Sequence, residues 1–372
     1  MWLNMLRIRS KKIWFVVAAV ASVLFCAVAD RYPVIIDYYR QFGVIPFIAS
    51  IYSRLTGLLP FSLAEMLIYI TVIFIMFYIV IFVVNVIKKQ DKKKYLIKVL
   101  WNIISVASVL ITMYMMLCGV YYSRRGINEY MGFEVRDYDA DDLYETSVYL
   151  VGEINKIYDK VDISKNIILT ELSKETVRIY KDFSKKHKEF NFSYGRPKTI
   201  LLSRQLSYTG IVGIFMPFTM EANINGDVEL YTIPASMCHE MAHMYGFMRE
   251  DEANYISYKV CIESDNDLFK LSGLMAELLM CQNELFFMDI EKYDKVEAMI
   301  PEKTKELSNT NDEYWNEIES TDVGEVVTDV AQDVNDTYLK FNGEEDGIIT
   351  YNQVVGLIVS DYLKQKNDQK SY

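Results

Sequence analysis

Two histidines four residues apart, with a glutamate beside the first, form the stretch of this sequence best suited to chemistry. The residues are His239, Glu240 and His243, in an H-E-x-x-H pattern. On a helix, side chains four positions apart share a face, so both imidazoles can reach one metal ion. Glu240 lies one position along, where its carboxylate can act as general base on a metal-bound water. The spacing predicts a catalytic zinc site with a third ligand from elsewhere in the chain.

The flanking sequence supports a helix for this pattern. Pro234 can open the helix and Gly246 can close it. The chain has only three histidines, so a chance match to the pattern is rare for this composition. The third, His187, lies among lysines and is expected to be solvated.

Three acidic residues directly after Gly246 are candidates for the third zinc ligand. They are Glu250, Asp251 and Glu252. On a helix, Glu250 and Glu252 diverge by about 200°, so only one can face the metal. Asn254 shares the face of Glu250 and could orient a metal ligand by hydrogen bonding. This favours Glu250 as the ligand, with Glu252 as the alternative and Asp251 as a surface charge.

Three apolar runs in the first third of the chain are long enough to cross a bilayer. They cover about residues 13–29, 63–87 and 96–122. The sequence therefore predicts a membrane region over 1–122 and a separate domain over 123–372. The segment 27–29 also resembles a signal-peptidase site, so cleavage there is an alternative for the first run.

Charge divides the chain at the same place. Residues 1–122 contain 13 Lys and Arg and 4 Asp and Glu, a net of +9, whereas the rest has a net of −20. Basic residues concentrate in the N-terminus and the 88–98 loop, which should face the cytoplasm. The chain is thus expected to be a multi-pass membrane protein with residues 123–372 extracytoplasmic and the lipid bilayer as a partner. The acidic domain argues against nucleic acid.

Two apolar stretches interrupt the loop between the first and second runs, at 44–48 and 55–60. Either they lie at the membrane surface, or they pack beneath the outer domain. Structural packing is the favoured interpretation.

The outer domain is expected to be α+β and mostly helical, with a small β-sheet. Helices are predicted near 137–160, 165–187, 265–287, 302–338 and 347–363, besides the two helices of the zinc site. Strands are predicted at 199–202, within 210–223 and at 228–233. Phe218 to Asn223 is either an edge strand that would hold an extended peptide or an ordinary structural strand.

Several blocks of the sequence resemble a family of bacterial membrane proteins known as domain of unknown function 3810. The blocks are 59–63, 210–219, 239–247, 250–255 and 336–340. The resemblance implies a multi-pass protein with an outward zincin-like domain. The Glu-x-x-Ala-Asn spacing of Glu250 to Asn254 is also similar to the third-ligand helix of several Glu-type zincins. Arg249 stands where the metzincin pattern needs a third histidine.

The sequence thus predicts a membrane-anchored zinc metallopeptidase that cleaves a peptide or protein substrate. The alternative is a non-catalytic membrane module in which zinc braces the fold, although such a site does not need Glu240. An intramembrane protease is disfavoured, because the charges at 249–252 keep the motif helix out of deep lipid.

Overall fold

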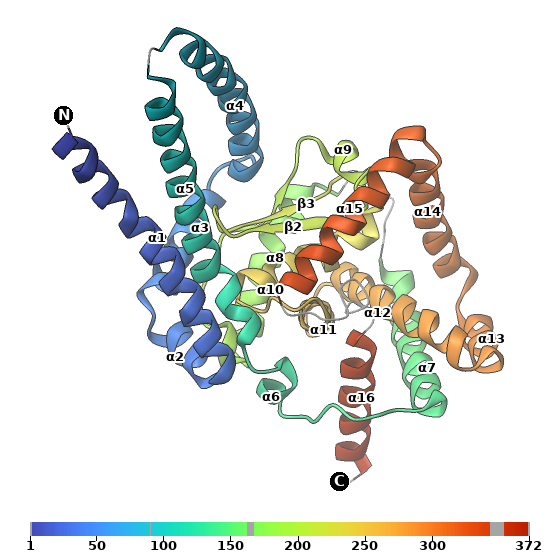
Figure 1. Ribbon diagram of the computed structural model, residues 1–372. Coiled ribbons are helices and arrows are strands. Elements are labelled where there is room, and N and C mark those ends of the chain that lie inside the picture. Colours follow the sequence, from blue (N-terminus) through green and yellow to red (C-terminus); the bar gives the residue numbers. More distant parts are fainter. Residues whose placement is uncertain (1, 90, 162–166, 343–352, 371–372) are drawn as a thin grey trace.

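Three long apolar helices extend from one side of the molecule. The computed structural model describes residues 2–89, 91–161, 167–342 and 353–370. Helices α1 (Trp2–Arg31), α4 (Leu63–Lys88) and α5 (Lys92–Leu117) lie together on the left of Figure 1. Each contains a stretch long and apolar enough to cross a membrane, which confirms the three predicted runs as helices. Helix α1 runs continuously through the segment that resembles a cleavage site.

Two shorter helices link α1 to α4. They are α2 (Val34–Phe42) and α3 (Val44–Gly57). The far end of α5 leads into a 3₁₀ turn, η1 (Gly119–Ser123), that packs against α1 and α2. A small apolar cluster joins α1, α2 and η1 to Met248, which lies between the two helices of the predicted zinc site. The apolar helices are therefore in direct contact with that site.

A three-stranded sheet lies beside α10, near the apolar helices (Figure 1). Strand β1 (Lys198–Thr199) pairs in parallel with β3 (Glu221–Ile224), and β2 (Gly213–Met216) pairs antiparallel with β3. The order is β1-β3-β2, so β3 is central and β2 is an outer strand. The prediction of an edge strand at Phe218 to Asn223 is therefore wrong. The crossover that inserts β3 between β1 and β2 is a long-range pairing that local sequence patterns do not encode.

The core of the domain forms around helix α10 (Ile233–Met244), which packs against α11 (Glu250–Ile262), α12 (Asp267–Met288) and both strands of the β2–β3 hairpin. Helices α7 (Ala140–Ile157) and α8 (Leu169–Phe183) cover the other sides. The remaining helices are α6 (Ile127–Met131), α9 (Ser203–Ser207), α13 (Ile290–Met299), α14 (Glu302–Glu319), α15 (Asp322–Phe341) and α16 (Val354–Lys370). The chain is thus mostly helical with a small sheet, as the sequence predicted.

Two further predictions need correction. The alternating stretch 228–233 is not a strand; Leu230–Thr232 forms a 3₁₀ turn that leads directly into α10. The expected helix over 302–338 is two helices, because Thr321 caps a new helix by accepting a hydrogen bond from Gly324 N–H at 2.9 Å. The predicted turn beginning at 347 lies outside the described residues, and the helix after it is α16.

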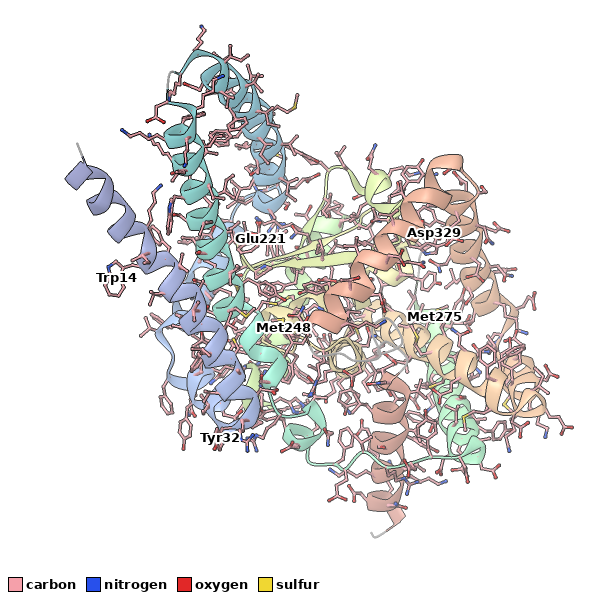
Figure 2. All side chains as sticks on the ribbon, viewed as in Figure 1. Trp14, Tyr32, Glu221, Met248, Met275 and Asp329 are labelled. Atoms are coloured by element: carbon pink, nitrogen blue, oxygen red, sulfur yellow. The ribbon has the colours of Figure 1, made fainter. Side chains whose placement is uncertain are left out.

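A buried ion pair ties the sheet to the start of α4. Lys198 Nζ lies 2.6 Å from Glu221 Oε1, and both side chains are 2% exposed. The Glu221 carboxylate also accepts the N–H groups of Leu63 and Ala64, the first residues of α4, at 3.2 and 2.8 Å. A carboxylate at this position satisfies N–H groups that have no partner within the helix. Figure 2 places Glu221 where the sheet approaches the apolar helices.

Candidate metal centre

A sharp turn between α10 and α11 brings the two halves of the candidate site together. Gly246 ends α10 with φ of 80°, a conformation that favours glycine. A Cβ at this position would lie 2.8 Å from the ring of Tyr121 in η1. Arg124 Nη1 donates hydrogen bonds to the carbonyl oxygens of Tyr245 and Gly246 at 3.1 and 3.3 Å. Helix α11 then begins at Glu250, close to the last turn of α10.

The structure brings His239, His243 and Glu250 together. The two Nε2 atoms are 3.1 Å apart, and they lie 3.1 and 3.7 Å from the carboxylate oxygens of Glu250. Ligand bonds of about 2.0–2.2 Å in a tetrahedral zinc site imply ligand-to-ligand distances of about 3.3 Å. The three side chains thus have the spacing that a single zinc ion requires, and they form a group that could hold a metal.

Hydrogen bonds fix both imidazoles with their Nε2 lone pairs toward the same point. His239 Nδ1 donates to Asn254 Oδ1 at 2.7 Å, and His243 Nδ1 donates to the carbonyl oxygen of Phe247 at 2.8 Å. When neither Nε2 atom is protonated, the two imidazoles and one carboxylate present three acceptors to one small space. Such an arrangement needs a cation, and Asn254 and Phe247 take the positions of groups that orient zinc-bound histidines.

The titration of the two histidines reflects the same crowding. Burial opposes protonation of His239, but hydrogen bonding and charge from Glu250 outweigh it and raise the pKa to about 9. Burial lowers the pKa of His243 to about 4, more than the charge of Glu250 raises it. One proton on the pair would thus partly supply the positive charge that the three acceptors lack.

Glu240 lies beside this group and is almost fully buried. Burial raises the pKa of its carboxyl to about 8, although a nearby positive His239 and a hydrogen bond from the backbone of Phe215 lower it. Within the described part of the chain, Glu240 Oε2 has no hydrogen-bond partner. A buried oxygen without a partner is costly unless a ligand or water satisfies it. This atom is therefore available to a group bound at the centre.

Strand β2 approaches Glu240 closely. A Cβ on Gly213 would lie 2.6 Å from Glu240 Oε1 and 2.7 Å from its Cγ, so no side chain fits at this position without a shift. The ring of Phe215, two residues along β2, lies 6.3 Å from that of His243. An outer strand thus runs directly past the candidate base and one candidate ligand.

The alternative ligand Glu252 is occupied elsewhere. Its Oε1 accepts the N–H of Ile127 at 2.6 Å and pairs with Arg249 at 2.5 Å, so this carboxylate tethers α6. Asp251 is half-buried rather than a plain surface charge, and burial raises the pKa of its carboxyl to about 6. The prediction of a solvated His187 is also wrong, because its ring is half-buried and its Nε2 lies 3.3 Å from Glu263 Oε1. None of these three side chains belongs to the group that could hold a metal.

Sequence reasoning missed the residues that position the site from a distance. Arg124, just past the third apolar run, holds the turn at Gly246, and its guanidinium lies 3.6 Å from the ring centre of Phe247. Gly213 gives Glu240 its space. The only sequence signal for Gly213 was its place in a family-like block. Arg124 had none, since the turn that it holds lies more than 100 residues away in the chain.

The fold and the site together define a mostly helical protein with three apolar helices and a buried His-His-Glu group. Over residues 39–359 the chain matches a family described as "Protein of unknown function (DUF3810)", and it belongs to that family. No curated protein and no solved structure matches the chain.

Proposed function

We propose that this protein is a membrane-anchored, zinc-dependent metallopeptidase with its site on the extracytoplasmic side. The observation that carries the proposal is the convergence of His239 Nε2, His243 Nε2 and the Glu250 carboxylate, three acceptors spaced for one zinc ion. When bound, zinc supplies Lewis-acid chemistry, since it polarises a carbonyl and lowers the pKa of water.

The protein's own residues would contribute proton transfer and substrate placement. Glu240 Oε2, which has no hydrogen-bond partner among the described residues, would take a proton from the attacking water and pass it to the leaving amine. The outer strand β2 is the position at which an extended substrate could add to the sheet and pass close to Glu240.

Membrane anchoring rests on the three apolar helices, and the orientation rests on the basic residues between α4 and α5. The zincin-like nature of the domain rests on the same site, because the motif helix, the adjacent outer strand and the Glu-bearing second helix occur together.

The test uses the full chain in detergent micelles or vesicles. Its metal content is measured by elemental analysis, and it is incubated with a proteome-derived peptide library. About one zinc per chain together with cleavage that a chelator abolishes is expected. One zinc without cleavage would favour the second function, a module that zinc only braces. Absence of zinc after loading would contradict both.

A further inference from the structure

The side chains of helix α3 are arranged in the opposite way to those of a surface helix in water, with polar residues buried and apolar residues exposed. Small and polar residues make up its buried face: Ala49, Ser50, Ser53, Thr56 and Gly57. Large apolar residues make up its exposed face and the residue that follows it: Val44, Phe47, Ile48, Ile51, Tyr52, Leu55 and Leu58. Val44 is 69% exposed, whereas Ser53 is 1% exposed. An amphipathic helix in water buries its apolar side, so the medium around α3 is apolar. The favoured prediction that this stretch packs beneath the domain is wrong for these side chains.

Helix α2 continues the same surface. Val34, Tyr38 and Phe42 are exposed and recur every four residues, which places them on one face. Ile36 and Arg40 are buried on the other side. The exposed apolar face thus extends from the end of α1 to the start of α4.

The charge of this segment differs from that of the domain behind it. Residues 38–64 contain no Asp or Glu and two arginines, Arg40 and Arg54, while residues 123–372 carry a net charge of −20. Arg54 is exposed among the apolar side chains of α3. A long basic side chain on an apolar helix face can extend to phosphate headgroups. Apolar and positively charged groups together match an anionic lipid surface.

The domain adds two exposed leucines to this surface. Leu201 is 68% exposed and Leu202 is 45% exposed. The Glu65 carboxylate in the first turn of α4 accepts their N–H groups at 2.8 and 3.0 Å, which holds both residues at the start of that apolar helix. Two segments distant in the sequence, 34–58 and 201–202, therefore place apolar side chains around the same end of the apolar helices.

We propose that the leaflet surface, defined as the exposed apolar residues of α2 and α3 together with Leu201 and Leu202, lies in the outer leaflet of the bilayer that α1, α4 and α5 cross. The occupant is lipid, because the surface is continuous with those helices and carries no acidic residue outside Asp37, which Arg125 pairs at 2.6 Å.

The inner face of α3 packs against the part of the domain that carries the metal centre. Thr56 Oγ1 in α3 donates to the carbonyl oxygen of Thr219 in the β2–β3 turn at 3.3 Å. Ala49 on the inner face of α3 and Met244, next to His243, line the same small cavity. If the outer face of α3 lies in lipid, its inner face holds the end of α10, and with it the metal centre, close to the bilayer surface. On the basis of the proposed peptidase function, the substrates of this protein are polypeptide segments held at the bilayer surface, next to a membrane span or a lipid anchor.

Photo-crosslinking from lipid tests the surface without using activity. The full chain is reconstituted in vesicles of phosphatidylethanolamine and phosphatidylglycerol containing a phospholipid with a diazirine in its acyl chain, and adducts are mapped by mass spectrometry. Adducts are expected on the outer face of α3 and at Leu201. Phe287 on α12, which is 85% exposed, is the matched control and should carry none. Adducts confined to α1, α4 and α5, or crosslinks of α3 to a second copy, would overturn the proposal.

A charge-insertion pair tests the substrate class. Ile48→Asp with Leu55→Asp is compared with Phe287→Asp, and all three positions are exposed, so folding should persist. One peptide is offered free in solution and attached to a phospholipid in the vesicles. The double variant should cleave the free peptide normally and the attached peptide roughly tenfold more slowly, whereas Phe287→Asp should match wild type on both. Equal rates of the double variant and wild type on the attached peptide would refute the substrate class. No cleavage of either peptide by wild type would refute the peptidase function, while the lipid adducts would still decide the surface.

Discussion

Adding a single methyl group at Gly213 should displace the candidate base Glu240 without changing zinc binding. In Gly213→Ala the new Cβ would lie 2.6 Å from Glu240 Oε1, 2.7 Å from Cγ and 2.9 Å from Cδ. Ordinary contact between such atoms begins at about 3.4 Å, so the carboxylate must move by about 0.5–0.8 Å. Among the described residues only the backbone of Phe215 is hydrogen-bonded to this carboxylate, and Oε2 has no partner, so the carboxylate can shift if that bond lengthens.

A displacement approaching 1 Å of a catalytic group costs about 100-fold in rate, which equals about 2.7 kcal/mol of transition-state stabilisation. We therefore expect Gly213→Ala to lower kcat and kcat/KM together by about 30- to 100-fold. Zinc content should stay at the wild-type value, since the three atoms nearest the new methyl group all belong to Glu240 and none to a candidate ligand.

The assay is steady-state cleavage of the best peptide from the library, with zinc measured on the same preparation. Gly152→Ala is the matched control, because a Cβ there meets nothing within 4 Å and the position lies in helix α7. Wild-type kcat in Gly213→Ala would refute the placement of Glu240 against β2. Loss of zinc along with kcat would show that the methyl group acts on the ligands instead.

Three other predictions follow from the described contacts. Glu250→Ala should lose zinc, whereas Glu252→Ala should keep it. Glu252→Ala should lower the free energy of unfolding by about 1–3 kcal/mol, because the N–H of Ile127 loses its acceptor. Elemental analysis measures the first effect and denaturant unfolding the second. Glu221→Ala should lower the free energy of unfolding by about 3–5 kcal/mol, since it leaves the buried charge of Lys198 without its carboxylate. A free energy of unfolding equal to that of wild type would contradict this. Reporter fusions after Lys89 and Tyr122 should report the cytoplasm and the exterior respectively, from the distribution of basic residues; a reversed result would move the site to the cytoplasm.

The parts of the fold that the sequence predicted well depend on local patterns. The three apolar runs and the helix of His239 and His243 are each encoded by consecutive residues. The strand predicted from the alternation at 228–233 was wrong, because a 3₁₀ turn leading into a helix can show the same pattern as a strand. The sheet order depends on a crossover between β1 and β3, which consecutive residues do not specify.

In the candidate site, too, local patterns were predicted well and contacts between distant residues were not. Helical spacing placed His239 and His243 on one face, and it separated Glu250 from Glu252. With Asn254 on the same face it favoured Glu250, but it could not show that Glu252 is occupied, because that contact comes from Ile127, distant in the chain. The exposed face of α3 was also open from sequence, since an apolar stretch looks alike whether protein or lipid covers it.

The role of Glu240 is tested most directly by comparing zinc content and hydrolysis in wild type and Glu240→Gln. Glutamine keeps the shape of the side chain and leaves His239, His243 and Glu250 unchanged, but its amide cannot accept the proton. About one zinc per chain is expected in both proteins, with chelator-sensitive hydrolysis in the wild type alone. Hydrolysis by Glu240→Gln close to the wild-type rate, or loss of zinc from that variant, would contradict it.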